Sequence, residues 1–169
     1  MLTKSLLKET DETEVRFYLA EDFREEKDGK VTAISLFTDP NVWLNMPADH
    51  PNPTKRNPAG LHSLSFLFNV TKAPQGALVS IDLKGPDSTK SVFKDQPMPS
   101  HSPTTKSANF IVRMMPCVIT SLGDRTFTVT VNKREFHFGF SIDRLDSHIA
   151  AIETTSPHKK SAPKKSKSQ

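Results

Sequence analysis

Apolar and polar side chains alternate along several short segments of the chain, which is the pattern of a β-strand with one buried face. Near the beginning, Val15, Phe17 and Leu19 are separated by Arg16 and Tyr18. Later segments repeat this spacing, and residues that favour turns lie between them. The spacing therefore predicts strands over most of the chain.

The clearest predicted hairpin has Asn132-Lys133 at its turn. Its apolar side chains recur at every second position on both strands, so they share one face. Each of them contributes about 1.5–3 kcal/mol when it is buried, and we expect this face to form much of the core. The face comprises Phe127, Val129, Val131, Phe136, Phe138, Phe140 and Ile142.

Other segments extend the predicted sheets. Residues 23–31 read as a charged connection, whose Asp28-Gly29 pair suits a tight hairpin turn. Residues 63–84 predict a second hairpin, in which Leu67 interrupts the polar face. Residues 108–119 are apolar on both faces, which predicts a central strand that ends near Pro116.

About seven or eight short strands that do not alternate with helices predict an all-β fold. We expect an antiparallel β-sandwich of immunoglobulin-like or C2-like type. Asp143 is placed to cap a short C-terminal helix that carries Leu145, Ile149 and Ile152. The predicted organisation is a flexible N-terminus at 1–13, one β-sandwich domain at 14–155 and a disordered, lysine-rich tail at 156–169.

Length and cysteine usage add constraints. The 169 residues suffice for one domain with a hydrophobic core. Cys117 is the only cysteine, which excludes an internal disulfide and suits a reducing compartment. The start of the chain lacks the apolar core of a secretory signal, and no segment reaches membrane-spanning length. We therefore expect a cytoplasmic protein without a membrane partner.

Residues 18–37 carry a resemblance. They combine a strand, the D-x-R-x-E-like segment of Asp22, Arg24 and Glu26, and a G-K-V turn into a second strand. This arrangement resembles the opening of a family of small uncharacterised bacterial proteins that end in immunoglobulin-like or C2-like strands. The resemblance implies a β-sandwich in a bacterial or phage-related cytoplasmic protein, and it assigns no activity, cofactor or catalytic residue.

Catalytic and metal-binding motifs are missing from the sequence. Asp82, Asp87, Asp95 and Asp124 lack the compact spacing of a calcium loop. The six histidines form no metal-binding pair, and the glycines form neither a nucleophile elbow nor a phosphate loop. We expect Cys117 to be a small buried residue. The sequence thus favours a non-enzymatic protein with no catalytic, cofactor-binding or metal-ligating residue.

Charge suggests two interaction sites. Asp22, Arg24 and Glu25 belong to the densest charged cluster of the predicted domain, which reads either as a structural ion pair or as a partner-binding patch. The tail has the composition of an arm that attracts polyanions, although it lacks an aromatic residue for base stacking and would bind weakly or serve only solubility. The lysines concerned are Lys159, Lys160, Lys164, Lys165 and Lys167.

Two loops rich in proline, 47–60 and 94–107, are unusually long for a compact domain. Trp43 precedes the first of them and is the best anchor by residue type, although Val42 and Leu44 on either side favour its burial in the core. Our leading hypothesis is a non-enzymatic protein-interaction module that presents both loops to a protein partner or to copies of itself. The alternative is a nucleic-acid-associated protein that uses the tail, with a metal-dependent or hydrolytic enzyme as a remote third.

Overall fold

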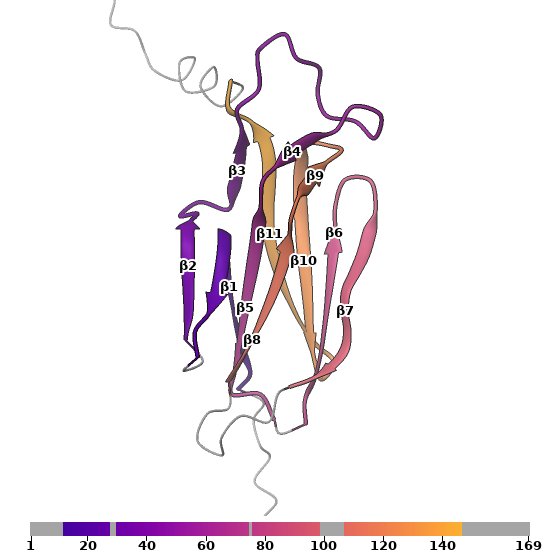
Figure 1. Ribbon diagram of the computed structural model, residues 1–169. Coiled ribbons are helices and arrows are strands. Elements are labelled where there is room, and N and C mark those ends of the chain that lie inside the picture. The colour runs from indigo at the N-terminus through magenta and orange to yellow at the C-terminus, as the bar shows by residue number, and fades with distance from the viewer. Residues whose placement is uncertain (1–11, 28–29, 75, 99–106, 147–169) are drawn as a thin grey trace, which may run out of the picture.

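The computed structural model describes residues 12–27, 30–74, 76–98 and 107–146, which form two main sheets packed face to face and a short two-stranded sheet of β4 and β9 (Figure 1). Sheet A has the strand order β2-β1-β5-β8, and sheet B has the order β3-β11-β10-β6-β7. The paired strands are antiparallel except β3 and β11, which are parallel. The strands are β1 Glu14–Glu25, β2 Val31–Leu36, β3 Asn41–Leu44, β4 Ala59–Leu61, β5 Leu64–Thr71, β6 Leu78–Lys84, β7 Thr89–Pro97, β8 Ser107–Met114, β9 Cys117–Ile119, β10 Gly123–Val131 and β11 Arg134–Arg144.

The all-β prediction is confirmed. Of the predicted C-terminal helix, Ile149 and Ile152 lie outside the described residues, as do the N-terminal residues 1–11 and the whole tail. Within the described ranges, no helix has the length and apolarity needed to cross a membrane.

Six phenylalanines join the two sheets. Phe17, Phe66 and Phe68 come from sheet A, and Phe127, Phe138 and Phe140 come from sheet B. Their contacting rings have centroids 4.7 to 6.2 Å apart, in stacked, tilted and edge-to-face pairs. Such geometries are favourable for aromatic rings beyond the area that they bury. This inter-sheet cluster is the centre of the core.

The predicted β10–β11 hairpin is confirmed, with Phe127 opposite Phe138 and with Asn132 and Lys133 both at positive φ in its turn. Phe138 faces the core as predicted, but it is half-buried, whereas Phe127 is fully buried.

β1 runs further than the sequence indicated. The predicted charged connection begins at residue 23, but the strand continues to Glu25, and Asp28-Gly29 lies outside the described residues. Phe23 is buried against Ala20 and Leu67, with Ile111 packed beside them, in a second small cluster. Leu67 and Ile111 face outward, because they alternate with the inward-facing residues of β5 and β8. Since Phe23 packs against both, the second half of β1 covers this part of the outer face of sheet A.

This second cluster explains a wrong prediction. Residues 108–119 are apolar on both faces, yet β8 lies at the edge of sheet A and is not a central strand. Its outward apolar residue, Ile111, is covered by the second half of β1 and not by a neighbouring layer. The inward face is buried as predicted, whereas on the outward face Ile111 is only half-buried and Arg113 is exposed.

β4 and β9 continue the pairing of β5 with β8. Leu64 opposes Met114 and Leu61 opposes Cys117, so the register is the same on both sides of the break. The break lies at residues 62–63 on one strand and at the cis Met115–Pro116 peptide on the other. Sheet A therefore reaches past its main ladder at the end where loop 45–58 lies (Figure 1).

β7 covers the first residues of the second predicted loop. β7 extends to Pro97, and residues 99–106 lie outside the described residues. The flanking strands β7 and β8 meet this segment at the end of the sandwich opposite loop 45–58 (Figure 1). The described ends of this segment therefore lie away from loop 45–58.

We predict that Phe127→Ala lowers the free energy of unfolding by about 3–5 kcal/mol, because it opens a cavity inside the inter-sheet cluster. Urea unfolding followed by circular dichroism measures this change. Val118→Ala is the control, since Val118 is 60% exposed, and it should change the free energy by less than about 0.5 kcal/mol. Equal losses for both variants would contradict the packing described here.

Candidate functional site

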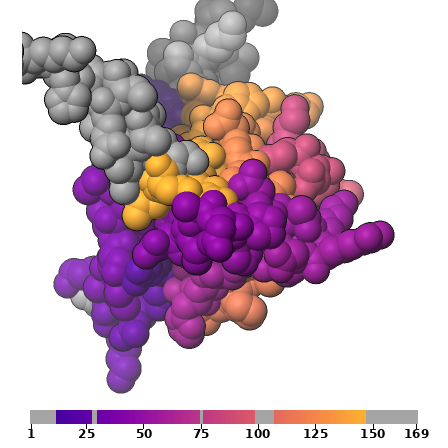
Figure 2. Space-filling model, turned by 90° about the horizontal axis from the view of Figure 1, so that it is seen from above, coloured from indigo at the N-terminus to yellow at the C-terminus, as the bar shows by residue number. Residues whose placement is uncertain are grey.

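Several connections meet at one end of the sandwich, which we call the loop end. It comprises loop 45–58 between β3 and β4, the turn 85–88 between β6 and β7, and the segments 115–116 and 120–122 on either side of β9. Seen from above, loop 45–58 crosses this end and lies against the last residues of β11 (Figure 2). Long connections on a rigid β scaffold are common places for recognition.

Arg144, at the end of β11, holds loop 45–58 in place. Its guanidinium is buried and donates hydrogen bonds to the backbone carbonyls of Pro47 at 2.8 Å, Ala48 at 3.3 Å and His50 at 2.6 Å. It also donates to Asn52 Oδ1 at 3.5 Å and, in a bidentate pair, to Asp146 at 2.9 and 2.8 Å. The hydrogen bonds to Asp146 raise the pKa of Arg144, so the group that fixes the loop stays charged.

The loop has further bonds of its own. Pro53 is buried, and residues 54–57 form a turn in which Thr54 and Asn57 exchange a backbone bond of 2.9 Å and a side-chain bond of 3.1 Å. Lys55 and Arg56 occupy the tip of this turn, and both are exposed. The loop is thus a shaped element that displays two cations, which the sequence-based prediction of a long loop did not foresee.

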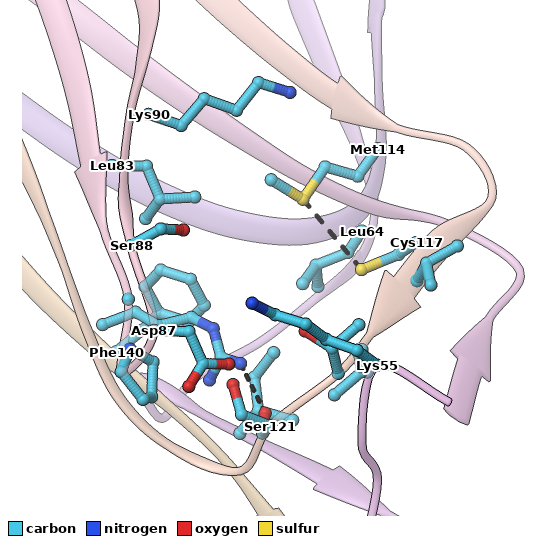
Figure 3. Close-up of a pocket in the computed structure, with 17 residues that line it drawn as sticks. Lys55, Leu64, Leu83, Asp87, Ser88, Lys90, Met114, Cys117, Ser121 and Phe140 are labelled. Atoms are coloured by element: carbon cyan, nitrogen blue, oxygen red, sulfur yellow. Dashed lines mark hydrogen bonds between the residues drawn. The ribbon is translucent and has the colours of Figure 1, made fainter. Parts of the chain in front are cut away.

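A pocket of about 200 Å³ opens between the two sheets at the loop end (Figure 3). Its floor is formed by apolar side chains of the core strands, including Leu64, Leu83, Met114 and Phe140. The turn 85–88 forms one wall, and β9 with residues 120–121 forms the other. The pocket therefore combines residues from both sheets and from loop 45–58.

Arg125 also lines this pocket. Its guanidinium donates to the carbonyl oxygens of Gly123 at 2.7 Å and Ser121 at 2.6 Å. Burial lowers the pKa of Arg125, and the nearby carboxylates of Asp143 and Asp87 partly offset this effect. The guanidinium nevertheless remains protonated, as arginine does in proteins. Gly123, at φ +104°, takes a conformation that favours glycine and turns its carbonyl to this arginine.

Cys117 is buried in the pocket wall, as predicted, and its Sγ lies 4.0 Å from Met114 Sδ. Burial raises the pKa of the Cys117 thiol, and Arg125 only partly opposes this shift. The thiol is therefore protonated at neutral pH and is a weak nucleophile.

The predicted charged cluster lies elsewhere, on sheet A. Asp22 pairs with Arg24 at 3.7 Å and with Arg113 at 3.4 Å, and Arg113 also donates to the Phe23 carbonyl at 2.5 Å. These contacts tie the second half of β1 to β8, which is the structural interpretation of the cluster. Glu25 is exposed, and none of the three predicted residues lines the pocket.

Trp43 is half-buried, and the expected burial in the core is wrong. Val42 and Leu44 are the buried residues of β3, and Trp43 lies between them on the opposite face, paired with Asp143. It adjoins loop 45–58 in the sequence but does not line the pocket. The predicted tail lysines, Lys159, Lys160, Lys164, Lys165 and Lys167, lie outside the described residues.

Sequence reasoning missed Arg125 and Arg144, although a signal for both was present. Arg125 continues the inward-facing series of Phe127 and Val129, and Arg144 continues that of Phe140 and Ile142. A charged residue in phase with a core face must find partners inside the fold. Lys55 had no such signal, because its position depends on how Arg144 shapes the loop.

No model of a known protein family matches the chain, and no curated protein matches it either. The resemblance of residues 18–37 to small bacterial proteins stays a prediction. In the described part of the chain, no three His, Cys, Asp or Glu side chains converge as a metal site would require.

We predict that Arg144→Met releases loop 45–58. The carbonyls of residues 47–50 lose their charged donor, so hydrogen exchange of backbone amides in the loop should accelerate by roughly tenfold. Mass spectrometry of the exchanged protein measures this. Arg56→Met is the matched control, since it removes an exposed cation from the same loop and should leave exchange unchanged. Similar exchange in Arg144→Met and the native protein would show that the loop is held by other contacts.

We also predict that Cys117 reacts slowly with iodoacetamide at pH 8, because its raised pKa keeps the thiol protonated and its side chain is buried. The comparison is Val118→Cys in a Cys117→Ser background, which moves the thiol by one residue to a position that is 60% exposed. The exposed thiol should react about 100-fold faster. Equal rates would mean that Cys117 is accessible and activated.

Proposed function

We propose that this chain is a non-enzymatic protein-interaction module that binds its partner through the loop end. The observation that carries the proposal is the hydrogen bonding of the buried Arg144 to loop 45–58. A loop held in one conformation before binding loses less entropy when a partner docks, and this favours affinity.

Exposed apolar side chains support this choice of surface. Met115 and Val118 are each 60% exposed, one before and one after Cys117 in the sequence, and Val118 lines the pocket. Apolar side chains next to shaped polar loops are typical of the core of a protein interface. The protonated Cys117 thiol favours binding over nucleophilic catalysis at the same place.

We infer that the sandwich is of the immunoglobulin-like type. In sheet A the order β1-β5-β8, and in sheet B the order β11-β10-β6-β7, correspond to strands A-B-E and G-F-C-C′ of a variable-type domain. Such domains carry binding loops between B and C and between F and G. Here those connections are the short segments 72–77 and 132–133, which directs the proposal to the opposite end. A cytoplasmic location is part of the same proposal and fits the buried, unpaired Cys117.

The test begins with affinity purification of the tagged protein from its native cells, followed by calorimetry with the partner that is identified. Met115→Ser with Val118→Ser should weaken binding by about tenfold or more, because both are at the proposed interface. Leu78→Ser is the matched control, since Leu78 is 46% exposed at the start of β6, at the other end of the sandwich. Weaker binding for Leu78→Ser alone would place the interface elsewhere and contradict the proposal.

A further inference from the structure

We propose that the pocket at the loop end binds one apolar side chain of an extended partner segment, together with a carboxylate next to that side chain. This inference rests on the proposed function and specifies the chemistry of the partner. It makes the pocket, and not the exposed loop surface alone, the specific part of the interface.

The pocket is large enough for one apolar side chain and too small for a cofactor. Its volume is about 200 Å³, and an apolar cavity of about 150 Å³ is known to hold benzene. Sites for cofactors and drug-sized ligands measure about 300–1,000 Å³. The pocket therefore suits one leucine, methionine or phenylalanine side chain.

The floor of the pocket requires that this side chain be apolar. Leu64, Leu83, Ile119 and Phe140 line it from four different strands. A polar group placed against them would lose its hydrogen bonds to water without replacement. The half-buried Met114 adds an adaptable surface that accepts side chains of different shape.

The net positive charge at the pocket favours a partner that carries a carboxylate next to the apolar side chain. Lys55, Lys90 and Arg125 contribute three cations, against the single carboxylate of Asp87. In Figure 3 the ammonium group of Lys55 reaches over the middle of the pocket, and Lys90 lies at its margin. Asp87 lies close enough to Arg125 to affect it electrostatically, and it would repel a doubly charged phosphate more than a carboxylate.

The neighbouring sheet edge favours an extended segment. β8 is an edge strand of sheet A, and in the described ranges β9 pairs only with β4. β8 has eight residues and no proline, whereas the edge strand β7 carries Pro97 and Asp95 at φ +48°. Edges without such features can accept a further strand, whose alternate side chains enter nearby pockets.

The probe is the peptide acetyl-Gly-Gly-Leu-Glu-Gly-amide, titrated into the ¹⁵N-labelled full chain at low salt. We expect shifts at Lys90, Val118 and Arg125. A peptide with alanine in place of leucine should bind about tenfold more weakly. A peptide with glutamine in place of glutamate should bind about threefold more weakly. Equal affinity of the three peptides would overturn the proposal.

The protein variants use two neighbouring cations. Lys55→Gln should weaken binding of the probe about threefold, and Arg56→Gln should leave it unchanged, because only Lys55 lines the pocket. If Lys55→Gln and Arg56→Gln weaken binding of the peptide equally, the peptide is attracted by the positive charge of the loop as a whole, and the inference is overturned. Binding of hexanoate without binding of any peptide would overturn it in favour of a small carboxylate ligand.

The inference and the proposed function fail separately. A partner whose binding depends on Met115 and Val118, combined with absent binding of the peptide, would leave the function standing and remove the pocket from it. Peptide binding in the pocket, combined with a partner whose binding does not change when Met115 and Val118 are replaced, would support the pocket as a binding site and contradict the proposed function.

Discussion

Contact between phenylalanines of the two sheets determines which residues of the long strands face inward. Phe127, Phe138 and Phe140 meet the rings of sheet A at 4.7 to 6.1 Å, so the phase of β10 and β11 is set along their whole length. A slip of one residue would turn every side chain to the other face. The same phase places Arg125 and Arg144 inward at the loop end. The candidate site is therefore a consequence of core packing.

Inward-facing arginines are tolerated here because they lie where the strands end. In the middle of the sandwich a guanidinium would be surrounded by rings and would lack acceptors. At the loop end, the chain leaves its hydrogen-bonded ladder and exposes carbonyl oxygens, which Arg125 and Arg144 bind at 2.6 to 2.8 Å in their shortest contacts. The cations satisfy loop carbonyls, and the carbonyls in turn stabilise charges that would otherwise be costly to bury.

Hairpins were predictable from the sequence only in part, and features that depend on distant residues were not. The hairpin predicted at residues 63–84 is wrong, because β5 belongs to sheet A and β6 to sheet B, so the chain crosses between the sheets there. The β10–β11 hairpin follows from alternation and a short turn. The burial of Phe23 requires Leu67 and Ile111, which lie far along the chain and pair through β5 and β8. The pocket draws on segments from residue 55 to residue 142. The error at Trp43 was avoidable, because period-two spacing places it opposite Val42 and Leu44.

In loop 45–58, the groups that fix the conformation differ from the groups that a partner would contact. Arg144 binds backbone carbonyls at 47, 48 and 50, and backbone groups are present whatever the side chains are. Lys55 and Arg56 take no part in those hydrogen bonds and stand at the exposed tip. Substitution at the tip therefore changes the charge that a partner meets while the loop keeps its shape. If the side chains at the tip shaped the loop, each change in recognition would also change the conformation.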